Sequence, residues 1–339
     1  ASGAEKEIVA LAERLRTPVA TSLNGKGTIA EDHELSVGVV GSYSRWCANR
    51  VVWEADVVLF VGSRAGGMTT EFWRVPAEGT TTVQIDIEAA AIGSSYPTMA
   101  GVQGDAKASI QALLDVLGDG GRDGAWAERA AGLVQEWREE LEPLFMSDAV
   151  PVRPERLCRE ITEFLPDDAV LVSDTGHAGI WTGTMIDLTR PGQNFIRCAG
   201  SLGWAFPAAL GAKCAAPERP VICFTGDGGF WYHLSELETA RRCGINTVTV
   251  VNNNRSLNQG RAAVERAYGG PGGGGDALWV FDDIDFAKVA ESMGCVGIRV
   301  TEPGEIAGAL KEALAMDRPV VVDVRSDPDV LAPTPVVPE

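Results

Sequence analysis

Short apolar runs alternate with amphipathic stretches through the second half of the chain. The runs are rich in Val, Ile and Thr, and the stretches between them place apolar residues at helical spacing. Such runs indicate strands buried on both faces, and their alternation with helices predicts a parallel sheet. The predicted strands are 169–173, 194–198, 221–225, 247–251, 296–300 and 319–324, and the predicted helices are 154–164, 177–187, 203–215, 230–243, 284–293 and 303–315.

The first 118 residues show the same alternation with fewer elements. Helices are predicted at 5–15 and 106–117, and strands at 18–22, 57–61 and 82–87. A Gly- and Asp-rich stretch at 118–124 interrupts the pattern, and a charged helix is predicted at 126–144. We therefore expect an α/β fold with two doubly wound parallel-sheet domains, at 1–118 and 151–328. A linker with a bridging helix (119–150) joins them, and an extended tail (329–339) follows.

Composition narrows the classes of function. The chain has 339 residues and a formal net charge of −18, which argues against nucleic acid or an anionic membrane as a partner. The seven cysteines are scattered and form no C-x-x-C pair, which fits a reducing cytoplasm. The three histidines, His33, His177 and His233, are far apart in sequence, so a His-rich zinc site is not expected.

The most informative motif is Gly226-Asp227-Gly228, with Asn254 following 27 positions after Asp227. The intervening residues read as one βαβ unit, and such a unit brings both strand ends to the same edge of a sheet. A carboxylate and an amide oxygen thus converge beside bare backbone amides. Hard oxygen ligands in this setting suit Mg²⁺ that holds a phosphate-bearing ligand.

Four polar or glycine-rich clusters fall at the same predicted sheet edge. They are 174–177, 199–203, 226–229 and 252–254. Any one of them reads as an ordinary turn, since Gly, Asp and Asn are the usual turn residues. Four together favour a phosphate site, because phosphate oxygens accept hydrogen bonds from exposed N–H groups and helix N-termini. A Gly-rich stretch at 268–276 is expected to form a mobile loop over this edge.

The ordered motifs resemble those of thiamine diphosphate-dependent enzymes. The Gly226-Asp227-Gly228 to Asn254 spacing is similar to the family signature, and the run 200–211 resembles the glycine-rich run of the acetolactate synthase and benzoylformate decarboxylase branch. In the first half, 17–27 and 83–88 resemble the family's central, Rossmann-like domain. The resemblance implies a thiamine diphosphate- and Mg²⁺-dependent enzyme. It would decarboxylate a 2-oxo acid and release or ligate the acyl unit, as acetolactate synthases do.

The resemblance also implies roles for individual residues. Asp227, Asn254 and the main-chain carbonyl of Ser256 would hold Mg²⁺. Leu202 would force the cofactor into its bent conformation, and the carbonyl of Gly200 would accept from the aminopyrimidine. The implied cofactor-binding set is Gly176, His177, Gly200, Ser201, Leu202, Gly226, Asp227, Gly228, Gly229, Asn254 and Ser256.

Some of these positions admit a second interpretation. His177 could contact the diphosphate or cap a helix, or act as an acid–base group toward substrate, and the phosphate role is favoured. Polar side chains after the metal motif indicate a polar or anionic substrate, with solvent exposure of the arginines as the alternative; they are Arg255, Asn258, Gln259 and Arg261. Arg64 follows a predicted strand and could meet the phosphate of FAD or ADP. Because residues 1–118 contain no G-x-G-x-x-G, an empty central domain is favoured.

The resemblance places the family's activating glutamate in an N-terminal pyrimidine-binding domain, to which no residue here is assigned. We therefore expect a separate subunit that carries that domain and glutamate, in a heterotetramer or larger assembly, with a fragment as the alternative. Two other functions are alternatives. A dinucleotide-dependent oxidoreductase would leave Asp227 and Asn254 unexplained. A non-catalytic regulatory subunit would not need to retain Asp227, Asn254 and Leu202.

Overall fold

The computed structural model describes residues 2–118, 123–198, 200–270 and 275–338. Its contacts divide the chain into two compact units. The first comprises the chain up to Leu141, with Asp187–Thr189 and the residues from Thr334 onward, and the second comprises Glu142–Ile186 and Arg190–Pro333. The units divide the chain differently from the expected ranges 1–118, 119–150 and 151–328. Residues 119–122, in the expected linker, lie outside the described residues.

The helix expected as a bridge is α4 (Ala125–Phe145), and most of it belongs to the first unit. Its Ala127 is buried in a cluster with Ala12 and Leu35. Trp137, also on α4, is only 4% exposed. The apolar face of α4 therefore packs as part of the first unit's core.

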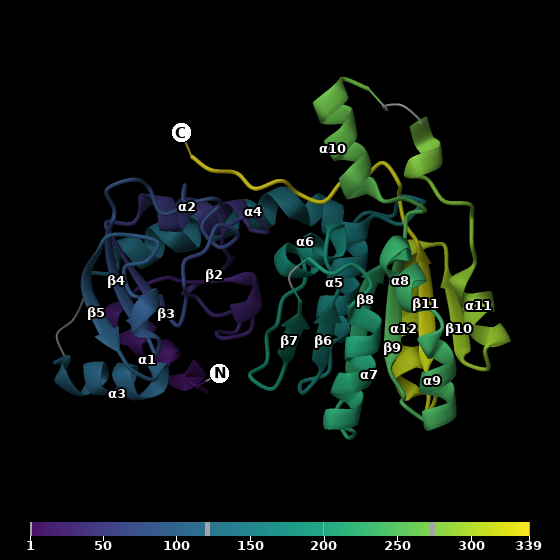
Figure 1. Ribbon diagram of the computed structural model, residues 1–339, viewed down its shortest axis with the longest axis horizontal. Coiled ribbons are helices and arrows are strands. Elements are labelled where there is room, and N and C mark those ends of the chain that lie inside the picture. The colour runs from purple at the N-terminus through teal and green to yellow at the C-terminus, as the bar shows by residue number, and fades with distance from the viewer. Residues whose placement is uncertain (1, 119–122, 199, 271–274, 339) are drawn as a thin grey trace. The chain divides into compact units, whose positions relative to one another are not determined.

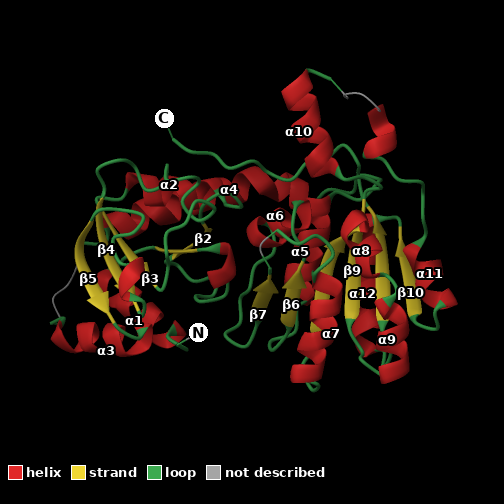
Figure 2. Cartoon of the chain, in the orientation of Figure 1, coloured by secondary structure: helices red, strands yellow, loops and turns green. Residues whose placement is uncertain are grey.

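The second unit is built on a six-stranded sheet (Figures 1 and 2). The strand order is β10-β11-β9-β8-β6-β7, and every pair is parallel. The strands are β6 (Val170–Ser173), β7 (Asn194–Arg197), β8 (Val221–Gly226), β9 (Val248–Asn253), β10 (Val296–Val300) and β11 (Val320–Arg325). Each lies within two residues of its predicted range, which confirms the doubly wound α/β class.

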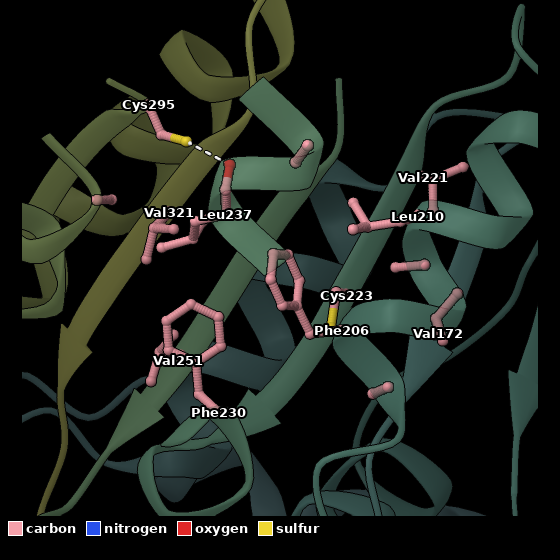
Figure 3. Packing of buried hydrophobic residues seen from close by; sticks show 14 of the residues in the cluster. Val172, Phe206, Leu210, Val221, Cys223, Phe230, Leu237, Val251, Cys295 and Val321 are labelled. Carbon is pink, nitrogen blue, oxygen red and sulfur yellow. Dashed lines mark hydrogen bonds between the residues drawn. The ribbon is translucent and has the colours of Figure 1, made fainter. Parts of the chain in front are cut away.

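Helices cover both faces of this sheet, because both faces are apolar. One face packs against α7 (Ala205–Ala215), α8 (Asp227–His233), α9 (Glu236–Cys243) and α11 (Phe286–Ser292). The other packs against α6 (His177–Thr184) and α12 (Ile306–Ala315), which both contact α5 (Pro154–Phe164). Figure 3 shows Phe206 of α7 and Phe230 of α8 among the buried side chains of the first face.

Two expectations for the second unit need correction. The helix predicted over 230–243 is two helices, α8 and α9, and α8 begins three residues earlier, at Asp227. Helix α10 (Asn258–Tyr268) was not among the predicted helices, and it lies beyond the carboxyl ends of the strands (Figure 2). Residues 271–274 of the expected mobile loop lie outside the described residues, and η3 (Gly275–Leu278) follows them.

The first unit holds two smaller parallel sheets. One pairs β1 (Val19–Thr21) with β2 (Ser36–Val39), and the other has the order β3-β4-β5. Its strands are β3 (Val57–Val61), β4 (Thr81–Asp86) and β5 (Thr98–Gln103), and its helices are α1 (Glu5–Leu15), α2 (Trp46–Glu54), α3 (Ala106–Val116) and most of α4. Short 3₁₀ turns are η1 (Leu23–Gly25), η2 (Ala89–Ala91) and, in the second unit, η4 (Pro303–Glu305).

Three elements of the first unit were missed: β2, β5 and α2. Strand β5 reads Thr-Met-Ala-Gly-Val-Gln and its residues are mostly exposed, so it lacks the apolar run of a buried strand. Across the described residues, no helix is both long and apolar enough to span a bilayer.

Candidate active site

The site is built where β8 and β9 end side by side. Asp227 follows β8 as the first residue of α8, and Asn254 follows β9. The backbone N–H of Ser256 donates to Asp227 Oδ2 at 3.1 Å and to Asn254 Oδ1 at 3.0 Å. Because both oxygens accept from one N–H, the parallel pairing has brought the carboxylate and the amide together, as the βαβ reading predicts.

Asp227 is a buried carboxylate with no salt-bridge partner in the part of the chain that the structure describes. It is 3% exposed, and burial raises its pKa from 3.8 to about 7, although hydrogen bonds from Gly228 and Ser256 oppose this shift. An unneutralised buried carboxylate is costly. A divalent cation at this position would supply the missing positive charge.

Ser256 offers further oxygen atoms beside this pair. It forms an isolated bridge with Val280, whose hydrogen bonds use the Leu257 N–H and the Arg255 carbonyl and so leave the Ser256 carbonyl unused by the bridge. Its side-chain Oγ is buried and has no hydrogen-bond partner among the described residues. Carboxylate, amide and carbonyl oxygens are the donors that Mg²⁺ takes. The described residues contain no group of three or more His, Cys, Asp or Glu side chains placed to hold a metal.

Glycines at the start of α8 are required by close packing. A Cβ at Gly228 would lie 2.5 Å from Leu257 Cδ2, and one at Gly229 would lie 2.7 Å from Asp174 Oδ2. A Cβ at Gly226, the last residue of β8, would have no neighbouring atom within 4 Å. The two positions after Asp227 therefore lack room for a side chain as the neighbouring groups stand, and glycine fits both.

Gly176 and His177 occupy the neighbouring turn, at the start of α6. Gly176 has φ +66°, and a Cβ there would lie 2.9 Å from Gln259 Oε1 on α10. His177 is partly buried, and burial lowers its pKa from 6.5 to about 4. The imidazole is therefore neutral at pH 7, able to donate a hydrogen bond from one ring nitrogen.

The third turn carries the residues expected beneath the cofactor. Gly200 and Gly203 both have positive φ, at +81° and +85°. Gly200 and Ser201 are exposed, Leu202 is half-buried and Gly203 is buried. Ala199 of this cluster lies outside the described residues. The turn thus presents an exposed backbone and one apolar side chain at the site.

The polar side chains expected near substrate divide into two groups. Gln259 lies against Gly176, as described above, and Arg255 has a buried Nε with no hydrogen-bond partner among the described residues. Asn258 is buried and donates to the Pro328 carbonyl at 2.5 Å. Arg261 forms ion pairs with Glu265 and Asp276 at 3.2 and 3.5 Å, so its charge is already partnered on the surface.

The remaining candidates lie elsewhere. Arg64, in the first unit, is exposed and ion-paired with Glu88. His33 contacts Glu13 at 3.3 Å, and His233 is exposed at the end of α8.

The sequence reading overlooked Asp174 as a site residue, although it opens one of the four clusters. Its carboxylate accepts hydrogen bonds from two other segments, at Gly203 and Thr225. The only signal in the sequence was an acidic residue directly after a buried strand, which an ordinary turn also explains.

The donor set fits a magnesium-bound diphosphate. Two converging oxygens, a buried carboxylate without a cationic partner among the described residues, and glycine-rich turns lie together at one sheet edge. Asp227, Asn254 and the carbonyl of Ser256 are the residues that could hold the metal. Gly228, Gly229, Gly176 and His177 are those that could contact the phosphates.

Comparison with known proteins agrees with this chemistry. Residues 1–113 match the model of the thiamine pyrophosphate enzyme central domain, and residues 174–324 match that of the thiamine pyrophosphate enzyme C-terminal TPP binding domain.

Full-length relatives show the same similarity. A probable acetolactate synthase large subunit of Methanocaldococcus jannaschii is 32% identical over 96% of this chain and 56% of its own length. The corresponding protein of Methanococcus aeolicus is 31% identical with the same coverage. A glyoxylate carboligase of Escherichia coli O157:H7 is 32% identical over 92% of this chain and 55% of its own length.

This chain therefore spans about half the length of these relatives. Its two matched segments correspond to two successive domains of one enzyme family. The chain belongs to the thiamine diphosphate-dependent enzymes.

Proposed function

We propose that the second unit binds thiamine diphosphate through Mg²⁺ and serves an enzyme that decarboxylates a 2-oxo acid and then releases or ligates the acyl unit. The observation that carries the proposal is the convergence of Asp227 Oδ2 and Asn254 Oδ1 on the N–H of Ser256. Supporting it, Asp227 is buried and lacks a cationic partner among the described residues.

The cofactor, when bound, supplies the nucleophile and the electron sink for decarboxylation. The chain's own residues bind and orient it. Asp227, Asn254 and the Ser256 carbonyl would hold the metal, while the first turn of α8 and His177 would face the diphosphate. Gly226 and Ser201 would lie alongside the bound cofactor. Leu202 and the carbonyl of Gly200 would fix the orientation of the rings, which gives catalysis by proximity.

The substrate side of the proposal is a small, polar 2-oxo acid. Gln259 lies at the edge of the site against Gly176, and Arg255 keeps a buried Nε unpartnered among the described residues. Amide and guanidinium groups donate hydrogen bonds, so they favour a substrate with a carboxylate over one with an aliphatic chain. Relatives named acetolactate synthase and glyoxylate carboligase are compatible with ligation as the outcome.

The direct test is calorimetric titration of the full chain with thiamine diphosphate, with and without Mg²⁺. We expect binding that depends on Mg²⁺ and is weakened at least ~100-fold in Asp227→Ala and Asn254→Ala, because each removes a metal ligand. Asp317→Asn is the matched control. Asp317 is exposed, and its carboxylate accepts from Asn246 at the opposite edge of the sheet. Unchanged binding in Asp227→Ala would show that the metal site is misassigned.

The proposal keeps the expectation of a separate subunit that carries the pyrimidine-binding domain and its activating glutamate. Native mass measurement of the purified assembly tests this point. A second chain of about domain size, ~150 residues, that restores decarboxylation would support it. Full activity in an assembly of this chain alone would exclude it.

A further inference from the structure

Three of the four strand-end turns meet at one buried carboxylate. Asp174 follows β6 and is 1% exposed. Its Oδ1 accepts from the Thr175 N–H at 2.8 Å and from the Gly203 N–H at 3.0 Å. Its Oδ2 accepts from the Thr225 hydroxyl at 2.9 Å. One side chain thus joins the turn before α6, the turn that carries Leu202 and the end of β8.

The same three turns also touch one another directly. A Cβ at Gly229, in the first turn of α8, would lie 2.7 Å from Asp174 Oδ2 and 2.9 Å from Thr225 Oγ1. A Cβ at Gly203 would lie 2.5 Å from Tyr232 Cβ and 2.9 Å from the Gly229 carbonyl oxygen. Because no space remains between these segments, a shift of the Asp174 carboxylate would move the others.

The surroundings of Asp174 supply hydrogen-bond donors and no salt bridge within the described part of the chain. Burial raises the pKa of Asp174, and the hydrogen bonds from Thr175, Thr225 and Gly203 oppose that rise. A buried carboxylate that is held only by neutral donors contributes little net stability compared with an apolar residue. Its value lies in where it places the donors.

We propose that Asp174 is a positioning residue whose carboxylate holds the Leu202 turn against the first turn of α8, and thereby sets the affinity for thiamine diphosphate. The effect of Asp174 on cofactor affinity rests on the proposed function. The ordering of the two turns does not, because it concerns only contacts within the second unit.

A purely structural role makes a different prediction. If Asp174 only added stability, its loss would lower the unfolding temperature. Amide exchange would then speed up throughout the second unit, with no extra increase at the Gly203 and Gly228 amides. A positioning role predicts faster exchange at the Gly203 and Gly228 amides than the global change in stability explains. It also predicts that an isosteric hydrogen-bond acceptor at position 174 slows this exchange again.

Hydrogen-exchange mass spectrometry of the full chain without cofactor separates the two. In Asp174→Ala we expect at least ~10-fold faster exchange in peptides covering 200–204 and 226–230, since the Gly203 N–H loses its acceptor. Asp174→Asn keeps an acceptor oxygen and should restore most of the protection. Thr225→Val, which removes one donor and keeps the side-chain shape, should loosen the same peptides less, and it tests the proposal if Asp174→Ala does not fold.

Gln193→Ala is the matched control. Gln193 is 3% exposed, donates to the Leu165 and Pro166 carbonyls and accepts from the Arg190 N–H, all within the second unit. It should lower the unfolding temperature without loosening 200–204. Equal exchange in Asp174→Ala and Gln193→Ala at those peptides would overturn the proposal.

Titration with thiamine diphosphate and Mg²⁺ completes the test. We expect at least ~10-fold weaker binding in Asp174→Ala, largely restored in Asp174→Asn, and no change in Gln193→Ala. Faster exchange at 200–204 and 226–230 with unchanged affinity would show that Asp174 does not set the affinity for thiamine diphosphate. If the wild-type chain bound no cofactor under conditions that support binding by the assembly, the proposed function would fail, and exchange would still decide the positioning role.

Discussion

Two buried sites, one in each unit, treat charge in opposite ways. In the first unit, Lys26 lies 2.5 Å from Glu31, and Arg45 forms ion pairs with Glu31 and Asp187. The Arg45 guanidinium also lies 4.5 Å from the ring centre of Trp137. In the second unit, Asp227 is equally buried and has no salt bridge within the described residues.

This difference separates a structural cluster from a candidate binding site. In the cluster around Arg45 each buried charge has an opposite charge within the protein, so the cluster is complete. Burial lowers the pKa of Lys26, and the neighbouring Glu31 opposes that shift. In the second unit the balancing charge must come from outside the chain's described residues. At Asp227 a converging amide oxygen lies beside a buried carboxylate that has no counter-charge among the described residues, so a cation is the natural ligand there.

The largest expected effect comes from breaking the complete cluster. Arg45→Met should destabilise the first unit by about 3–5 kcal/mol, because it leaves Glu31 and Asp187 buried without their cation. The measurement is the free energy of opening of α2 by native-state hydrogen exchange. Arg64→Met is the control, since its exposed pair with Glu88 should contribute at most about 1 kcal/mol. Similar losses in the two variants would remove the distinction between the units.

The second prediction inverts the usual effect of removing a buried charge. The pKa of Asp227 is about 7 when folded and about 3.8 when exposed, so the folded state binds the proton more tightly. The cost of its charge is absent below pH ~4 and complete above pH ~7.

In EDTA at pH 8, Asp227→Asn should therefore match or exceed the stability of the wild type, by at most about 4 kcal/mol. With Mg²⁺ the order should reverse, because the charged carboxylate holds the metal more tightly than a neutral amide does. Thermal unfolding in EDTA and in Mg²⁺ measures both. A variant that was less stable in EDTA as well would indicate that Asp227 is balanced within the protein.

The third prediction concerns His177. Its folded pKa of about 4 lies below the ordinary 6.5, so the unfolded chain binds the proton more tightly. The stability that the neutral imidazole contributes is complete above pH ~6.5 and is lost as pH falls toward 4, by up to about 3 kcal/mol. NMR titration of the three histidines, with His177→Gln for assignment, measures the value. Bound diphosphate should raise this pKa, since an anion favours the imidazolium; a pKa near 6.5 without ligand would refute the burial argument.

The smallest expected effect compares two residues of α10. Gln259→Ala should weaken cofactor or substrate binding a few-fold, because its amide lies against Gly176. Arg261→Gln should change binding less than about twofold, since Arg261 is paired with Glu265 and Asp276 on the surface. Titration and steady-state kinetics of the assembled enzyme measure both. A larger loss in Arg261→Gln would place that guanidinium in the site.

Strands of the second unit could be predicted because each is buried on both faces and reads as an unbroken apolar run. The joint placement of Asp227 and Asn254 followed from the same pattern, since parallel strands end at one edge. The first unit was harder to predict. Strand β5 is mostly exposed, and its sequence includes a glycine, so its pairing with β4 is set by neighbours rather than by its own residues.

Asp174 could not be assigned from sequence, because its partners Gly203 and Thr225 are 29 and 51 positions away. The burial of Asp227 was hidden for the same reason. It depends on which segments lie against the side chain, and spacing along the chain does not report that.

By itself, the sequence determined the α/β class, the strand order along the chain and the residue types that gather at one sheet edge. These follow from local patterns, since hydrophobic periodicity and turn residues act over a few positions. Only the tertiary structure decided which charges are balanced, as in the cluster around Arg45, and which are left for a ligand, as at Asp227. Charge balance depends on distance and burial, and both are properties of the packed chain.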